Sequence, residues 1–181
     1  MDLERKFARF SDGLSVTEDA VIEGYASLFG QVDQGRDVVQ KGAYAASLAR
    51  LKVAGQRVKM LWQHDPTQPI GVWDDVREDE RGLWVKGRLL ESTQKGREAA
   101  ELIRAGALDG LSIGYRTKRA VKDDKGRRLL TELELWEVSL VTFPMLPSAR
   151  VAAKGTDPDA EDTWRSIAEV FENARQELAR P

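Results

Sequence analysis

The 181-residue sequence contains no cysteine and a single histidine, His64. Without cysteine the chain can form no disulfide, no thiolate metal site and no cysteine nucleophile. A zinc centre is not expected either, because zinc sites usually take several histidine or cysteine ligands. The composition therefore excludes functions that depend on a cysteine thiol, and we expect no metal.

The sequence also lacks a strong excess of charge and any long apolar run. Its net charge of −2 gives no electrostatic reason to expect direct nucleic-acid binding. Residues 1–6 are mostly charged and contain no apolar signal core, and no run approaches the roughly 20 apolar residues that span a bilayer. We expect no membrane association and a protein that is cytosolic where it is made.

What the sequence does contain is a real core and many short β-rich segments. Hydrophobic residues make up 41% of the chain, and its length fits one domain with an appendage. Periodicity predicts strands over residues 3–10, 20–29, 57–64, 70–76, 83–90, about 110–115 and 129–143. It predicts two helices, over residues 41–54 and 92–105. We therefore predict an α+β, β-rich fold: a partly closed six- to seven-stranded barrel with peripheral helices.

Local signals refine three of these elements. Asp65-Pro66 should stop the strand over 57–64, which leaves His64 at a strand end. Ser92 is expected to cap the helix over 92–105. The segment 129–143 is apolar on both faces, which is typical of a central, covered strand.

The composition changes after Pro147. Residues 148–162 look like a polar linker, and Asp157 followed by Pro158 can begin a helix. Apolar residues then fall on one helical stripe, namely Trp164, Ile167, Ala168, Phe171, Ala174 and Leu178. We expect a domain over 1–150 and a linker with an amphipathic helix over 151–181, which docks either on its own domain or on a partner chain.

The run from Gly110 to Tyr115 sets one serine between apolar residues. As a strand it points Leu111, Ile113 and Tyr115 one way, and Ser112 and Gly114 the other. The second face is nearly bare, so another chain's backbone could approach the Ser112 hydroxyl. The alternative is a core strand with a buried serine and a bulge glycine.

Glu137 is an acid on an apolar strand, and a buried carboxylate needs a donor. A histidine that acts as base for a serine needs such a carboxylate to orient it, so Ser112, His64 and Glu137 form a chemically complete set. The alternative is a salt bridge from Glu137 to an arginine, with His64 only capping a strand end. Ser139 is the competing serine on the same predicted strand as Glu137.

Six stretches of the sequence also resemble one known family. They are Gly24-Tyr25-Ala26-Ser27-Leu28-Phe29-Gly30, Gly42-Ala43-Tyr44 with Ser47-Leu48, Met60-Leu61-Trp62-Gln63-His64-Asp65-Pro66, Pro69-Ile70-Gly71, Gly110-Leu111-Ser112-Ile113-Gly114-Tyr115, and Leu135-Trp136-Glu137-Val138-Ser139-Leu140-Val141-Thr142-Phe143-Pro144. In this order, over about residues 20–150, they resemble the prohead maturation proteases of tailed bacteriophages. This serine protease family also occurs in phage-derived gene transfer agents and is similar in fold to the herpesvirus assemblin proteases.

The resemblance implies roles for individual residues. His64 would be the base and Ser112 the nucleophile. The herpesvirus enzymes use a second histidine as third member, which this chain lacks, so that role passes to an acid. Glu137 matches the family's Trp-Glu-Val-Ser-Leu motif and is our choice, with Glu134, which strand parity places on the opposite face, as the fallback.

By the same resemblance the chain is a serine endopeptidase that needs no cofactor. Its expected substrates and partners are the scaffold protein, or a scaffold-like segment of the major capsid protein, and the protease itself. It would work in the bacterial host cytoplasm, inside the assembling prohead. Whether the active form is a monomer, a homodimer or a larger homo-oligomer stays open.

Two other classes of function stay open at this point. One is a non-catalytic capsid assembly or scaffold protein that keeps the protease fold and uses its terminal helix as a contact. The other is a general intracellular hydrolase unrelated to capsids. Cleavage of the neighbouring capsid protein that depends on Ser112 would separate both from the maturation protease.

Overall fold

The computed structural model describes residues 4–8, 15–16, 20–33 and 35–142. These residues form one nine-stranded sheet and two helices. The linker and helix predicted after Pro147 lie outside the described residues, so that prediction stays a prediction.

Eight strands follow one another across the sheet, and the ninth pairs from the side. The order is β1 (Glu4–Ala8), β8 (Gly110–Lys122), β9 (Arg128–Val141), β5 (Lys59–Trp62), β6 (Asp65–Glu78), β7 (Gly82–Leu89), β3 (Val21–Leu28) and β2 (Ser15–Val16), with β4 (Asp37–Val39) beside β9. Neighbours are antiparallel except that β4 and β5 each run parallel to β9. The predicted class of fold is confirmed, and β9 is central as expected. The short strands β2 and β4 were not predicted.

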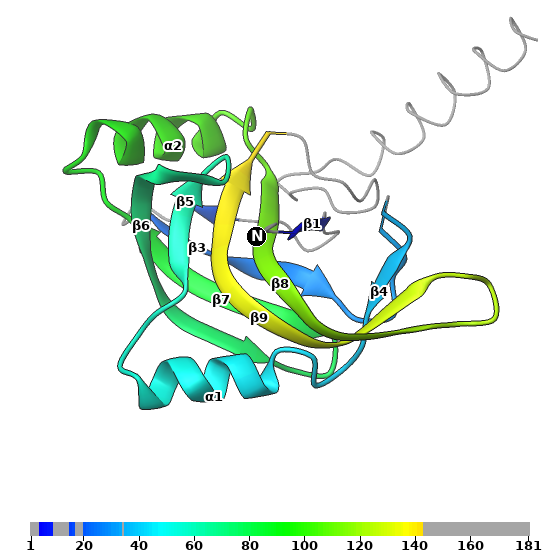
Figure 1. The fold of residues 1–181 in the computed structure, drawn as a ribbon. Helices are drawn as coiled ribbons and strands as arrows, with labels where there is room; N and C mark the ends of the chain where they lie inside the picture. The colour runs from blue at the N-terminus through cyan, green and yellow to red at the C-terminus, as the bar shows by residue number, and fades with distance from the viewer. Residues whose placement is uncertain (1–3, 9–14, 17–19, 34, 143–181) are drawn as a thin grey trace, which may run out of the picture.

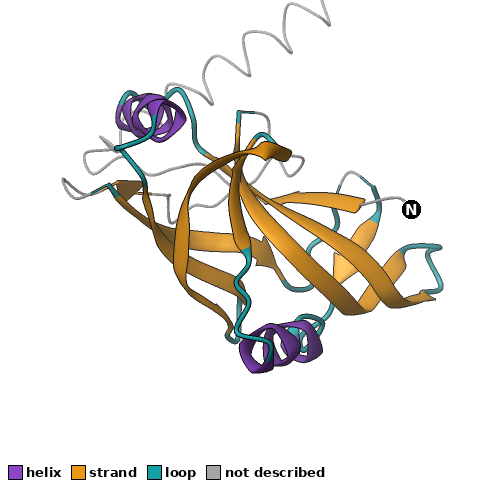
Figure 2. Ribbon diagram, turned by 60° about the vertical axis from the view of Figure 1, so that its left-hand side comes forward, coloured by secondary structure: helices purple, strands orange, loops and turns teal. Residues whose placement is uncertain are grey.

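The sheet curls into a partly closed barrel around an apolar interior (Figures 1 and 2). The strand β3, near one end of the sheet order, comes close to β1 and β8 at the other end. Side chains from most strands meet inside and are almost fully buried, among them Ile22, Met60, Ile70, Leu83, Val85, Leu111, Ile113, Leu133, Val138 and Leu140. Burial of this apolar surface from water stabilises the fold.

The helices α1 (Ala45–Val53) and α2 (Gln94–Arg104) lie at opposite ends of the barrel (Figures 1 and 2). The cap of α2 is Thr93 and not Ser92, because the Thr93 hydroxyl accepts a 3.1 Å hydrogen bond from the Gly96 N–H. The predicted start of α1 at residue 41 was four residues too early. Neither helix in the described ranges is long and apolar enough to cross a membrane.

The chain reverses direction between β5 and β6 earlier than the sequence suggested. Gln63 and His64 both have a positive φ, 52° and 63°, and Asp65 already pairs with Trp62 as the first residue of β6. The prediction that Asp65-Pro66 stops the strand was therefore wrong by two residues. Pro66 is compatible with its place because it stands at the start of its strand, where a missing N–H is tolerated.

The strand β9 carries a bulge that changes which side chains face the core. Gly114 of β8 pairs with Glu137, but the next residue of β8, Tyr115, pairs with Leu135, so Trp136 is the extra residue. The strict alternation expected along this strand is therefore broken at Trp136, which is 45% exposed.

Candidate active site

Strands β8 and β9 place a polar cluster on the side of the sheet away from the barrel interior. Ser112 pairs directly with Ser139, and Gly114 with Glu137. Residues opposite each other in an antiparallel pair share a face, so the two serines and the carboxylate are neighbours. Leu111 and Ile113, the alternate residues of β8, belong to the core. The predicted division of β8 into an apolar and a polar face is thus correct.

His64 enters this face from the turn between β5 and β6. A positive φ is unfavourable for any residue with a side chain, so the turn must be held by other contacts. The Gln63 N–H donates to the Leu140 carbonyl at 2.9 Å, and the His64 N–H donates to the Ser139 hydroxyl at 3.2 Å. Two anchors on β9 therefore fix the backbone that carries the imidazole.

The three residues predicted from the sequence meet in one hydrogen-bonded line. The Ser112 Oγ lies 2.6 Å from His64 Nε2, and His64 Nδ1 lies 2.5 Å from Glu137 Oε1. All three are buried, with 0%, 5% and 4% of their surface exposed. Since a carboxylate only accepts hydrogen bonds, the proton of a neutral imidazole belongs on Nδ1, which leaves Nε2 to accept the Ser112 hydroxyl proton.

Ser139 is the member of this cluster that the sequence analysis placed only as a rival nucleophile. Its hydroxyl donates to Glu137 Oε2 at 2.5 Å and accepts from the His64 backbone. It therefore contacts the carboxylate and the backbone of the turn. Its place two residues after Glu137, on the same strand face, is the signal that could have revealed this contact.

Over the described residues, the structure does not show the alternatives considered for the two acids, which were an arginine partner for Glu137 and contact of Glu134 with His64. Glu137 bonds His64 and Ser139, and not an arginine. Glu134 pairs with Lys118 at 3.0 Å and with Arg116 at 3.6 Å. The Lys118 ammonium beside it holds the pKa of Glu134 below its usual range, despite the opposing effect of burial.

Gly114 is needed for a reason that the sequence did not indicate. A Cβ at this position would lie 2.1 Å from Glu137 Oε1, so the carboxylate fills the space above the glycine. The sequence analysis predicted that this face of β8 would be nearly bare. At Gly114 it is instead filled by the Glu137 side chain from β9.

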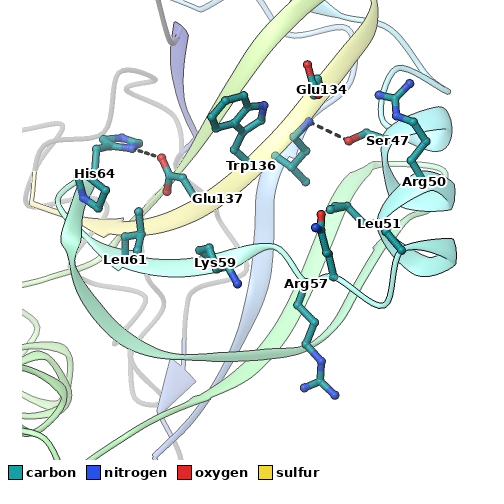
Figure 3. A pocket seen from close by; sticks show the side chains of 14 residues that line it. Ser47, Arg50, Leu51, Arg57, Lys59, Leu61, His64, Glu134, Trp136 and Glu137 are labelled. Atoms are coloured by element: carbon teal, nitrogen blue, oxygen red, sulfur yellow. Dashed lines mark hydrogen bonds and ion pairs between the residues drawn. The ribbon is translucent and has the colours of Figure 1, made fainter.

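A cavity of about 760 Å³ adjoins the cluster at its His64–Glu137 end, between β5, β9 and α1 (Figure 3). Its lining includes apolar side chains such as Leu51, Leu61 and Trp136, together with basic ones. In the described ranges no group of three histidine, aspartate or glutamate residues is arranged to hold a metal ion. The cavity is large enough for a side chain of a peptide or a small ligand.

A serine hydroxyl bonded to an imidazole that is bonded in turn to a carboxylate is the constellation of the serine hydrolases, here built on the outside of a curled β-sheet. Comparison with known sequences gives the family. Residues 8–162 match the caudovirus prohead serine protease family, and the chain belongs to it.

Individual relatives agree with this assignment. The chain is 32% identical over 156 residues to the prohead protease of Enterobacteria phage HK97, covering 83% of this chain and 66% of that protein. It is 32% identical over 124 residues to the prohead protease of Escherichia phage T5, and this match covers 68% of this chain and 57% of that protein. The chain thus spans less than two thirds of the length of these relatives.

Two further similarities concern a larger protein and a solved structure. The chain is 31% identical over 145 residues to a capsid polyprotein of Pseudomonas phage PAJU2, which covers 75% of this chain and 20% of that protein. The structure of the bacteriophage T4 capsid assembly protease superposes with a TM-score of 0.59 at 19% identity, over 78% of this chain and 98% of that one. This structural likeness supports the fold.

Proposed function

We propose that this chain is a serine endopeptidase of capsid maturation, with Ser112 as nucleophile, His64 as general base and Glu137 as the acid that orients the imidazole. The observation that carries the proposal is the line of hydrogen bonds from Ser112 Oγ through both nitrogens of His64 to Glu137. Ser139 acts as a positioning residue, because it binds both the Glu137 carboxylate and the His64 backbone.

In the proposed reaction His64 Nε2 takes the proton of Ser112 as its Oγ attacks a peptide carbonyl carbon. The proton then passes to the leaving amine as the C–N bond breaks, and an acyl-Ser112 ester remains. Water attacks this ester and gives a proton to the same Nε2, which returns it to Ser112 when the acid product leaves. Glu137 stays ionised and stabilises the imidazolium that forms in each half of the cycle.

The substrates that we propose are the scaffold protein, or a scaffold-like segment of the major capsid protein, together with the protease itself. The relatives that are prohead proteases and a capsid polyprotein support this choice. The reaction would take place in the host cytoplasm inside the assembling prohead. We also keep the proposed division into a protease domain over 1–150 and an appended linker and helix over 151–181.

Co-expression with the major capsid protein from the same phage or gene transfer agent tests the proposal. We expect the capsid protein to be shortened, as seen by mass spectrometry, with the wild-type chain and not with Ser112→Ala. The control is Ser27→Ala, which removes a hydroxyl from another buried serine, outside the cluster, and should leave processing unchanged. Processing that survives Ser112→Ala would contradict the assignment, and binding without any cleavage would favour the scaffold alternative.

A further inference from the structure

The cavity beside the triad contains three basic side chains. Arg50 lies on the last turn of α1, Arg57 lies between α1 and β5, and Lys59 begins β5, where it pairs in register with Glu137 on β9. All three line the cavity together with His64 (Figure 3). The cations thus come from two neighbouring segments that border one cavity, and Figure 3 shows the Arg50 and Arg57 side chains extending in different directions.

Arg57 and Lys59 have no counter-ion of their own in the described ranges, whereas Arg50 is close enough to Glu134 to help lower the pKa of that carboxyl. Neither guanidinium nor the Lys59 ammonium forms an ion pair or hydrogen bond with any residue of the described ranges. Elsewhere in the same ranges basic side chains are commonly paired, as Arg88 is with Asp74 and Lys86 with Glu23. Arg57 and Lys59 therefore leave unmatched positive charge at the cavity.

The two acids that also line the cavity do not offset it, because each is already engaged. Glu134 pairs with Lys118 and Arg116 from β8, and Glu137 accepts from His64 and Ser139. The remaining wall is mostly apolar, and among the described residues Ser47 and Gln56 are its only uncharged polar side chains apart from Trp136 and His64. Such a space, apolar with a positive rim, suits a side chain that ends in a carboxylate.

We infer that this cavity is a substrate subsite that selects an aspartate or glutamate of the peptide to be cleaved. The inference rests on the proposed function and names the class of residue that this site recognises. The cavity meets the triad at His64 and Glu137, and Ser112 is not part of its lining. The selected acid therefore occupies one fixed position in the peptide relative to the cleaved bond.

A peptide library made by tryptic digestion of a bacterial lysate tests the inference with the full chain. Cleavage sites are identified by mass spectrometry, and sites that also appear with Ser112→Ala are discarded. We expect aspartate and glutamate to be enriched at one position relative to the cut. In the Arg57→Gln/Lys59→Gln double variant kcat/KM for acidic peptides should fall about tenfold, from the loss of two solvent-exposed charge pairs.

A matched control separates local from general electrostatics. Lys122→Gln/Lys125→Gln removes two exposed cations at the tip of the β8–β9 hairpin, and it should keep the acidic preference. Equal losses in both double variants would overturn the inference, because they would show only attraction by net charge. Cleavage without acidic enrichment would overturn it as well, while leaving the proposed function standing.

A binding measurement keeps the inference testable if no Ser112-dependent cleavage occurs. Ser112→Ala labelled with 5-fluorotryptophan is titrated with two decapeptides that differ only in glutamate against glutamine, and the Trp136 signal is identified with Trp136→Phe. Trp136 is half-exposed and lines the cavity. We expect a saturable shift with the glutamate peptide alone. The same response to both peptides, or none to either, would overturn the subsite.

Discussion

The carboxylate of Glu137 occupies the space that a side chain at Gly114 would fill. The two residues are direct partners across β8 and β9, and a Cβ on Gly114 would approach Glu137 Oε1 to 2.1 Å. The acid can therefore reach His64 only because its cross-strand partner is glycine. This pairing links a sequence feature of the Ser112 strand to the orientation of the imidazole.

Gly114→Ala should abolish most of the activity while the barrel still folds. The added methyl group displaces Glu137 from His64, and losing the orienting acid of a serine protease triad lowers kcat by up to about 10⁴-fold. Activity on a capsid-protein substrate and the circular dichroism spectrum measure the two effects. We expect the loss in Gly114→Ala to approach that in Glu137→Gln.

A double variant tests whether Gly114 acts through its contact with Glu137, because the activity losses of two residues in contact are not additive. Glu137→Asp shortens the acid and frees room for the methyl group, so Gly114→Ala should cost much less activity in the Glu137→Asp background than in the wild type. Fully additive losses would show that Gly114 acts through something other than contact with Glu137.

Ser139→Ala should lower kcat with little change in KM, because Ser139 bonds two members of the proposed triad and is not expected to touch the substrate. The change leaves the His64 N–H and Glu137 Oε2 each without this buried partner, which lowers the free energy of unfolding by about 1–3 kcal/mol. Ser139→Thr keeps a hydroxyl and should retain more activity. Denaturation curves and steady-state kinetics give both quantities, and unchanged kinetics in Ser139→Ala would rule out the positioning role.

Activity should fall in acid as one proton is taken up by His64. The imidazole must be neutral to accept the proton of Ser112, and the chain has no second histidine. A plot of log kcat/KM against pH should therefore have a slope of one on its acidic side. The midpoint should match the NMR titration of the single imidazole in the free enzyme, and full activity where that signal is protonated would exclude a histidine base.

The part of the chain after residue 150 should be dispensable for catalysis. Its predicted helix carries Trp164, Ile167, Phe171 and Leu178, and burying each such side chain is worth roughly 1.5–3 kcal/mol. We expect these residues to dock the protease on scaffold or capsid protein. Deleting 151–181 should leave cleavage of added substrate intact but exclude the protein from assembled particles. Loss of folding on deletion would place the helix in the protease domain.

The sequence predicted the class of fold and the three residues that meet because both depend on residue types. A lone serine between glycines, the only histidine and an acid on an apolar strand are rare features that can be found without coordinates. The alternation of β8 also placed Ser112 opposite the core. Strand pairing could be anticipated for the hairpin of β6 and β7, since its apolar segments are close in sequence.

The remaining features depend on distant contacts. The reversal at Gln63-His64 uses positive φ values that a prolyl stop signal two residues later obscured, and it is held by bonds to β9. The bulge at Trp136 arises from pairing with β8 and reverses the parity that the sequence suggested. The role of Gly114 follows only from that register, and the bond from the His64 N–H to Ser139 follows only from the position of the turn. Apart from the spacing of Glu137 and Ser139 on one strand face, none of these features has a local sequence signal.

Covalent labelling by diisopropyl fluorophosphate tests the central claim most directly, because it reports which serine is activated. The account predicts one phosphoryl adduct per chain, located on Ser112 by peptide mass mapping, with labelling slowed by at least about 100-fold in a His64→Ala variant. Ser112→Ala should not be labelled at all. An adduct on Ser139, or labelling of Ser112 that does not depend on His64, would contradict the proposed triad.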